Sequence, residues 1–178
     1  MVMTRIPERH LNNEGHVVYI IFRLKITDSK VDEINNWVRD LQPDAEFNIP
    51  AYVDCFLSEN LVRKFIEEKK IPLSPDAETE RDKWRNAEVY NKNKANISID
   101  IRRSNSELSY LSMDGLANLV DKAKDPLKVA GLSRDATEYK PMRDALAHTA
   151  LLTDLAKNRL TTVYENIKGR VRALLSGK

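Results

Sequence analysis

The sequence has 178 residues, of which 42% are hydrophobic and 31% are charged, and its formal net charge is only +2. This balance is typical of a globular protein of about one domain, and it excludes a disordered or low-complexity chain. Five glycines and seven prolines are too few for a turn-rich β-sandwich, so they favour a mainly α fold with long helices.

The chain contains a single cysteine, Cys55, so it can form no intrachain disulfide and no cysteine-based zinc site. Residues 1–10 are charged and no apolar stretch follows them, which predicts that no signal peptide is present. The longest apolar run, at 17–22, is far shorter than the roughly 20 residues that span a bilayer. We therefore expect a cytoplasmic protein that needs no membrane, no metal ion and no other cofactor.

The charge is unevenly distributed along the chain. From Lys140 to the C-terminus there are eight basic and three acidic residues, a net charge of +5, which leaves −3 on the rest. A basic end favours a polyanionic partner, although a helix with a solvated basic face explains the same charge.

The first elements expected along the chain are a strand and a helix. Apolar and polar side chains alternate over residues 16–26, which predicts a strand. An amphipathic helix should begin near Asp28 and end at Gln42-Pro43-Asp44. Its apolar stripe contains Val31, Ile34, Trp37 or Val38, and Leu41.

Two further helices are predicted before residue 97. One spans residues 58–70 and ends at Ile71-Pro72. The next begins at Ser74-Pro75-Asp76, because a hydroxyl cap, a proline and an acid are favoured at a helix start. This helix should end near residues 91–96. Its Trp84, like Trp37, is most simply a core residue.

The middle of the chain is expected to add a short strand and a helix. Residues 97–101 alternate strictly and could pair with the strand at 16–26 in a small two-stranded β ribbon. A helical period returns at 106–122, with a break near Asp114-Gly115. The sequence of residues 125–139 predicts a short helical turn and a loop.

The last two helices have the clearest patterns. Pro141 should open a helix that runs to about Leu152, and Thr153 should cap the final helix. The final helix carries a regular apolar stripe, composed of Leu160, Val163, Tyr164, Ile167, Val171, Leu174 and Leu175. We therefore expect a strand–helix appendage at 1–50, or the end of a preceding domain, followed by a helical domain at 51–178.

The helix that Pro141 opens has two apolar faces. One face is expected in the core and contains Met142, Ala145, Leu146, Thr149 and Leu152. The opposite face carries a strip of small and apolar residues, Ala147, Ala150 and Leu151. Because small residues let a second helix approach closely, we expect this strip to form a homodimer interface.

Arg143 and His148 flank this strip, about 140° apart around the helix. The segment Arg143-Asp144-Ala145-Leu146-Ala147-His148 resembles the Arg-x4-His motif of the HEPN superfamily, in which a polar residue commonly follows the arginine. The resemblance covers residues 51–178 and implies an HEPN-like helical bundle. Some family members carry a tyrosine two residues after the histidine, where antitoxins modify it; Ala150 stands there, so such control is not expected.

The resemblance implies a metal-independent endoribonuclease, a hydrolase that serves as a toxin or as an antiviral defence effector. The ribose 2′-OH would attack the neighbouring phosphorus and leave a cyclic phosphate, so DNA would be spared. His148 would transfer a proton, since imidazole has a reference pKa near 6.5. Arg143 would stabilise charge on the phosphate, with Asp144 orienting it. Lys140 and Arg159 could bind the RNA backbone, although solvation of a helix surface explains them equally well.

Two other functions stay open at this point. One is a non-catalytic HEPN domain that dimerises and binds nucleotide or RNA to regulate a larger system. The other is a helical adaptor without a ligand. The family further implies a cognate antitoxin, or an upstream sensor or ATPase domain, as a partner.

Overall fold

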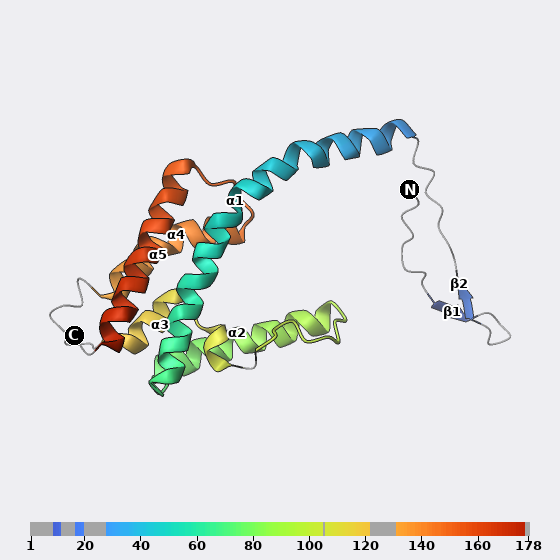
Figure 1. Cartoon of the computed structure of the whole chain (residues 1–178). Coiled ribbons are helices and arrows are strands. Elements are labelled where there is room, and N and C mark those ends of the chain that lie inside the picture. The colour runs from blue at the N-terminus through green and yellow to red at the C-terminus, as the bar shows by residue number, and fades with distance from the viewer. Residues whose placement is uncertain (1–8, 12–16, 20–27, 105, 122–130, 177–178) are drawn as a thin grey trace. The chain divides into compact units, whose positions relative to one another are not determined.

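The computed structural model describes residues 9–11, 17–19, 28–104, 106–121 and 131–176, and this part of the chain is mainly helical (Figure 1). The predicted all-α class is therefore confirmed. In chain order the elements are β1 (Arg9–Leu11), β2 (Val17–Tyr19), α1 (Asp28–Glu68), α2 (Pro75–Lys94), the 3-10 helix η1 (Glu107–Tyr110), α3 (Met113–Val120), α4 (Leu132–Ala147) and α5 (Asp154–Leu175).

The chain divides into two compact units, residues 1–46 and 47–178, and the boundary falls within α1. In the first unit, β1 and β2 pair antiparallel, with His10 opposite Val18. The strand expected at 16–26 is present at 17–19; residues 16 and 20–26 lie outside the described residues. Its partner is β1 and not the expected 97–101, which is described and contains no strand. A nearby partner is favoured because closing a short loop costs less entropy.

The helix α1 runs without interruption through Pro43 and Pro50, so the predicted end at Gln42-Pro43-Asp44 is wrong. A proline inside a helix removes one backbone hydrogen bond and costs about 3 kcal/mol. Its fixed φ is nevertheless a helical value, so the residues on both sides can continue the helix. The helix predicted at 58–70 is the last part of α1.

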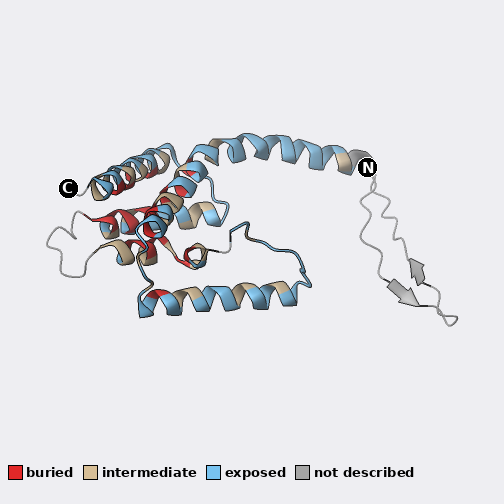
Figure 2. Cartoon of the chain, turned by 60° about the horizontal axis from the view of Figure 1, so that its bottom comes forward, coloured by how far each residue is buried: buried red, intermediate tan, exposed pale blue. Residues whose placement is uncertain are grey.

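The core of the second unit lies where α4 packs against α3 and α5. Figure 2 shows the buried residues gathered on these helices and on the later turns of α1. The stripe predicted for α5 is confirmed at Leu160, Val163, Ile167 and Val171, which are buried, but it is wrong at Leu175, which is 55% exposed at the end of the helix. Thr153 caps α5 as predicted, and its hydroxyl accepts a hydrogen bond from the Ala156 N–H at 3.2 Å.

The start and end of α2 agree with the prediction. The Ser74 hydroxyl accepts a hydrogen bond from the Ala77 N–H at 3.3 Å, and the helix ends at Lys94. The expectation that Trp84 is a core residue is wrong, because its side chain is 48% exposed. Trp37 in the first unit is also exposed. Ala77 is the buried residue of α2, which is mostly polar and therefore covers little core.

The helix expected at 106–122 consists of η1 and α3, and they are separated at Leu111–Ser112 rather than near Asp114-Gly115. The reason is a cap: the Ser112 hydroxyl accepts a hydrogen bond from the Gly115 N–H at 3.2 Å and so starts α3. Gly115 itself is inside the helix, and a Cβ there would collide with the carboxylate of Glu80 on α2. A side chain at this position would therefore displace the Glu80 carboxylate, which accepts a hydrogen bond from the Ser112 N–H at 2.9 Å.

The helix α4 begins at Leu132, so the prediction that Pro141 opens it is wrong. Residues 125–130 lie outside the described residues, and 132–139, expected as a turn and loop, are the first half of α4. Asp121 explains the earlier start. Its carboxylate accepts hydrogen bonds from the Ser133 N–H at 2.8 Å and from the Ser133 hydroxyl at 2.7 Å, and it thereby caps the helix.

Candidate active site

The helix α4 ends at Ala147, five residues before the predicted end at Leu152, and His148 is its C-cap. Thr149 adopts a left-handed conformation with φ 59°. Its N–H donates to the Leu146 carbonyl at 2.9 Å, and the Ala150 N–H donates to the Ala145 carbonyl at 3.0 Å. This is the Schellman pattern that terminates helices. The motif therefore starts on a helix and finishes on the turn that ends it.

The early end of α4 changes both faces predicted for this helix. Met142, Ala145 and Leu146 pack against the core as expected, but Thr149 is exposed. Leu152 is buried, yet it reaches the core from the connector between α4 and α5, where its N–H donates to Asn48 Oδ1 at 3.2 Å.

The residues expected at the dimer interface do not lie on one helix face. Ala147 is the last residue of α4, whereas Ala150 and Leu151 belong to the connector. The prediction that these three residues form a strip on one face of a helix is therefore wrong. All three side chains are exposed in the single chain. Their role in dimerisation stays a prediction.

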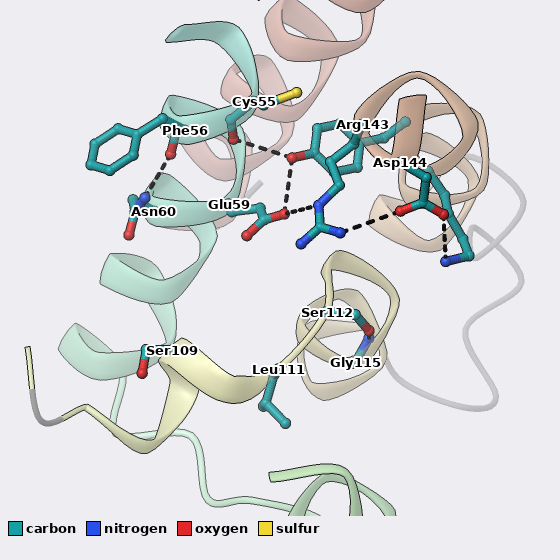
Figure 3. A network of polar contacts seen from close by, with 12 residues as sticks. Cys55, Phe56, Glu59, Asn60, Ser109, Leu111, Ser112, Gly115, Arg143 and Asp144 are labelled. Atoms are coloured by element: carbon teal, nitrogen blue, oxygen red, sulfur yellow. Dashed lines mark hydrogen bonds and ion pairs between the residues drawn. The ribbon is translucent and has the colours of Figure 1, made fainter. Parts of the chain in front are cut away.

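Arg143 lies on α4, and two carboxylates contact its guanidinium group (Figure 3). Its Nε is 3.4 Å from Glu59 Oε1, and its Nη1 is 3.3 Å from Asp144 Oδ1. Within the part of the chain that the structure describes, Nη2 has no hydrogen-bonding partner. The side chain is 44% exposed. The group is thus anchored on one side and accessible on the other.

Glu59 on α1 is the centre of the polar network that holds Arg143. Its side chain is only 14% exposed, and Arg63 lies 2.7 Å from Oε2. The Tyr139 hydroxyl is 3.0 Å from Glu59 Oε1 and 3.2 Å from the Cys55 carbonyl oxygen. Because Tyr139 is on α4 and the other groups are on α1, this network fixes the two helices to each other at the level of Arg143.

The network favours the charged forms of Arg143 and Asp144. Partial burial is the largest single effect on the pKa of Arg143 and lowers it, but Glu59, Tyr139 and Asp144 together outweigh burial, and the pKa is raised. The hydrogen bond from Lys140 is the main cause that lowers the pKa of Asp144. Burial raises the pKa of Tyr139, so its hydroxyl keeps the proton that it donates. Arg143 is therefore a permanent cation between two anions.

His148 is exposed, and its side chain makes no hydrogen bond or ion pair with any residue that the structure describes. The structure thus brings Arg143 and Asp144 into contact, as the sequence suggested, but it does not bring His148 into the same network. The imidazole lies just beyond the helix end, with no partner that fixes its orientation within the described residues.

The two residues expected to bind RNA already have acidic partners. Lys140 Nζ is 3.0 Å from Asp144 Oδ2, one helical turn away. Arg159 on α5 is 2.6 Å from Glu138 Oε1 on α4. Both basic side chains are more than half exposed, so these are surface ion pairs of small energy that a phosphate group could replace.

Sequence reasoning missed Glu59 and Tyr139. A signal for Tyr139 was its place one turn before Arg143, where a side chain on the same helix face is a neighbour. No comparable signal existed for Glu59, since it is on a different helix and looks like an ordinary polar residue of an amphipathic pattern.

Within the described residues, no group of three or more histidine, cysteine, aspartate or glutamate side chains is placed to hold a metal ion. No described helix is both long and apolar enough to cross a membrane. Comparison of the chain with protein-family models, with curated proteins and with solved structures found no match in any of the three.

Proposed function

We propose that this protein is a metal-independent endoribonuclease of the HEPN type, in which Arg143 and His148 act in a composite site at a homodimer interface. It would serve as a toxin or an antiviral effector. The observation that carries the proposal is the state of Arg143: a permanent cation, anchored by Glu59 on one side and accessible on the other.

An anchored arginine suits phosphate chemistry because its orientation is fixed before the substrate arrives. Glu59 and Asp144 occupy Nε and Nη1 of Arg143, and Nη2 still has its donors available to phosphate oxygens. Guanidinium groups bind phosphate oxygens in a planar, often bidentate geometry. Arg143 can therefore stabilise the charge that develops on a phosphate under attack.

In the proposed reaction, the ribose 2′-oxygen forms a bond to the adjacent phosphorus and the bond from phosphorus to the 5′-oxygen breaks. The imidazole of His148 accepts the proton of the 2′-hydroxyl, and the 5′-oxygen takes up a proton as it leaves. A second histidine, contributed by the other subunit, is suited to donate that proton. The products are a 2′,3′-cyclic phosphate and a 5′-hydroxyl end.

The first experiment incubates the full chain with mixed RNAs in the presence of a chelator. We expect cleavage that Arg143→Ala or His148→Ala reduces by about 10²- to 10³-fold. Arg172→Ala is the matched control, because it removes an exposed arginine from α5 and leaves the motif intact. Unchanged cleavage in the two motif variants would overturn the proposal.

A second experiment tests the composite site. Inactive His148→Ala subunits are mixed in increasing excess with the unmodified chain. If one site uses the histidines of both subunits, each mixed dimer has only one of the two, and activity falls below that of the same amount of unmodified chain alone. A monomer in light scattering, or activity that the added variant does not lower, would remove the dimer from the proposal.

One observation favours a second function, a non-catalytic HEPN domain that dimerises and binds nucleotide or RNA. Arg143 is already compensated by Glu59 and Asp144, as in a purely structural ion-pair network. Binding of RNA that Arg143→Ala weakens, without cleavage under any condition tested, would select this alternative.

A further inference from the structure

A polar cavity of about 300 Å³ is lined by α2, from Arg81 to Lys92, and by residues after it that include Asp100, Arg102 and Tyr110. It shares no lining residue with the Arg143 network. Its volume is at the lower end of the range of small-molecule sites. The cavity is therefore a separate candidate for ligand binding.

The helix α2 contributes a charged stripe to this cavity. Arg81, Arg85, Glu88 and Lys92 all line it, at spacings of four, three and four residues. Such spacing places side chains along one face of a helix. Arg85 and Lys92 are two turns apart, about 10 Å along the axis.

The acids of the cavity leave part of this positive charge uncompensated. Glu88 Oε2 is 2.6 Å from Arg102 Nε, and Glu107 Oε2 is 3.0 Å from Arg81 Nη1. Among the residues that the structure describes, neither Arg85 nor Lys92 forms an ion pair. With four basic and three acidic lining residues, the cavity has a net charge of +1. It is suited to an anion.

Arg102 adds a flat surface with a fixed orientation. Its guanidinium carbon lies 4.2 Å from the centre of the Tyr110 ring, and its Nη1 donates to the Ser109 carbonyl at 2.7 Å. Together with the ion pair to Glu88, these contacts hold the guanidinium plane in place. Guanidinium planes and aromatic rings are the surfaces on which proteins stack unpaired bases.

We propose that this cavity binds a phosphorylated nucleoside, with its phosphate at Arg85 and Lys92 and its base against the Arg102–Tyr110 stack. Phosphate recognition by basic side chains and stacking of the base are the two contacts that such a ligand requires. The ligand is either a free nucleotide or one nucleotide unit of single-stranded RNA. The proposal does not depend on the function of Arg143.

The test is a calorimetric titration of the full chain at low salt with four probes: adenosine monophosphate, adenosine, inorganic phosphate and a short oligoadenylate RNA whose 2′-hydroxyls are methylated, so that the proposed nuclease reaction cannot cut it. We expect adenosine monophosphate to bind at least about tenfold more tightly than adenosine or phosphate, because it makes both contacts. Equal affinity for the oligonucleotide and the monophosphate identifies the free nucleotide as sufficient, and much tighter binding of the oligonucleotide identifies RNA as the source.

The double variant Arg85→Gln/Lys92→Gln should weaken binding of the monophosphate by at least about tenfold. Its control is Arg103→Gln/Lys94→Gln, which removes the same two charges from exposed neighbouring positions outside the cavity. The control should change the affinity less than twofold. Equal losses in both variants would mean non-specific attraction and would overturn the proposal, as would the absence of any binding by the unmodified protein.

Discussion

Two apolar stripes with a helical spacing differ in burial in this protein. In α5, Leu160, Val163 and Ile167 are completely buried. In the first unit, the stripe of α1 that contains Ile34, Val38 and Leu41 is 48–64% exposed. Both stripes follow a helical period in the sequence, although that of α5 is the more regular. The difference teaches that periodicity predicts which face of a helix is apolar, but not whether something covers that face.

The two stripes should therefore contribute very differently to stability. Complete burial of a leucine or valine side chain stabilises a fold by roughly 1.5–3 kcal/mol. A side chain that is half exposed contributes only part of this. Pairs of identical substitutions at buried and exposed positions test this contrast.

The largest effect is expected in α5. Leu160→Ala should lower the free energy of unfolding by about 2–5 kcal/mol, because it leaves a cavity in the core. The same change in the other stripe, Leu41→Ala, should alter it by no more than about 0.5 kcal/mol. Urea denaturation measures both. Similar losses in the two variants would mean that a partner, such as a second copy, covers the stripe of α1 in solution.

A closer comparison uses one helix alone. Val62, in the later part of α1, is fully buried, whereas Val38 is exposed. Val62→Ala should cost roughly 1.5–3 kcal/mol. Val38→Ala should be neutral or stabilise the protein by a few tenths of a kcal/mol, since alanine has the higher helix propensity. A lower melting temperature for Val62→Ala and an unchanged or higher one for Val38→Ala would establish the contrast within α1. A clearly lower melting temperature for Val38→Ala would contradict it.

The smallest effect concerns the polar network. Tyr139→Phe removes the hydroxyl that bridges Glu59 and the Cys55 carbonyl, and it should cost about 1.5 kcal/mol. Tyr52→Phe, at an exposed tyrosine on α1, is the matched control and should have no effect. If the two variants have equal stability, the network does not contribute to the attachment of α1 to α4.

Local signals predicted much of the fold. Ser74 and Thr153 mark helix starts because their hydroxyls cap the first turn, and each of these hydrogen bonds joins residues only three positions apart. The continuous α1 was not predictable from Pro43, since proline weakens a helix without forbidding it. The start of α4 was also missed, because its cap, Asp121, is 11 positions away from Leu132 in the sequence.

The same distinction applies to the candidate site. Arg143 and Asp144 are adjacent in sequence, so their contact could be expected. The contact of Arg143 with Glu59 joins helices that are far apart along the chain, and no local pattern specifies it. The Schellman turn after His148 was missed for another reason. Its left-handed residue is a threonine, where glycine is the usual signal.

Among the helices that the structure describes, three end on such turns without glycine: Lys70 follows α1, Asn96 follows α2 and Thr149 follows α4. Of these, threonine is the least suited to positive φ, since its branched side chain crowds the backbone. Thr149→Gly should relieve this crowding and loosen the chain beside the imidazole. The melting temperature and the rate of any reaction that uses His148 would then both respond to substitution at this one position. Protein engineers could therefore adjust stability and activity through Thr149 alone.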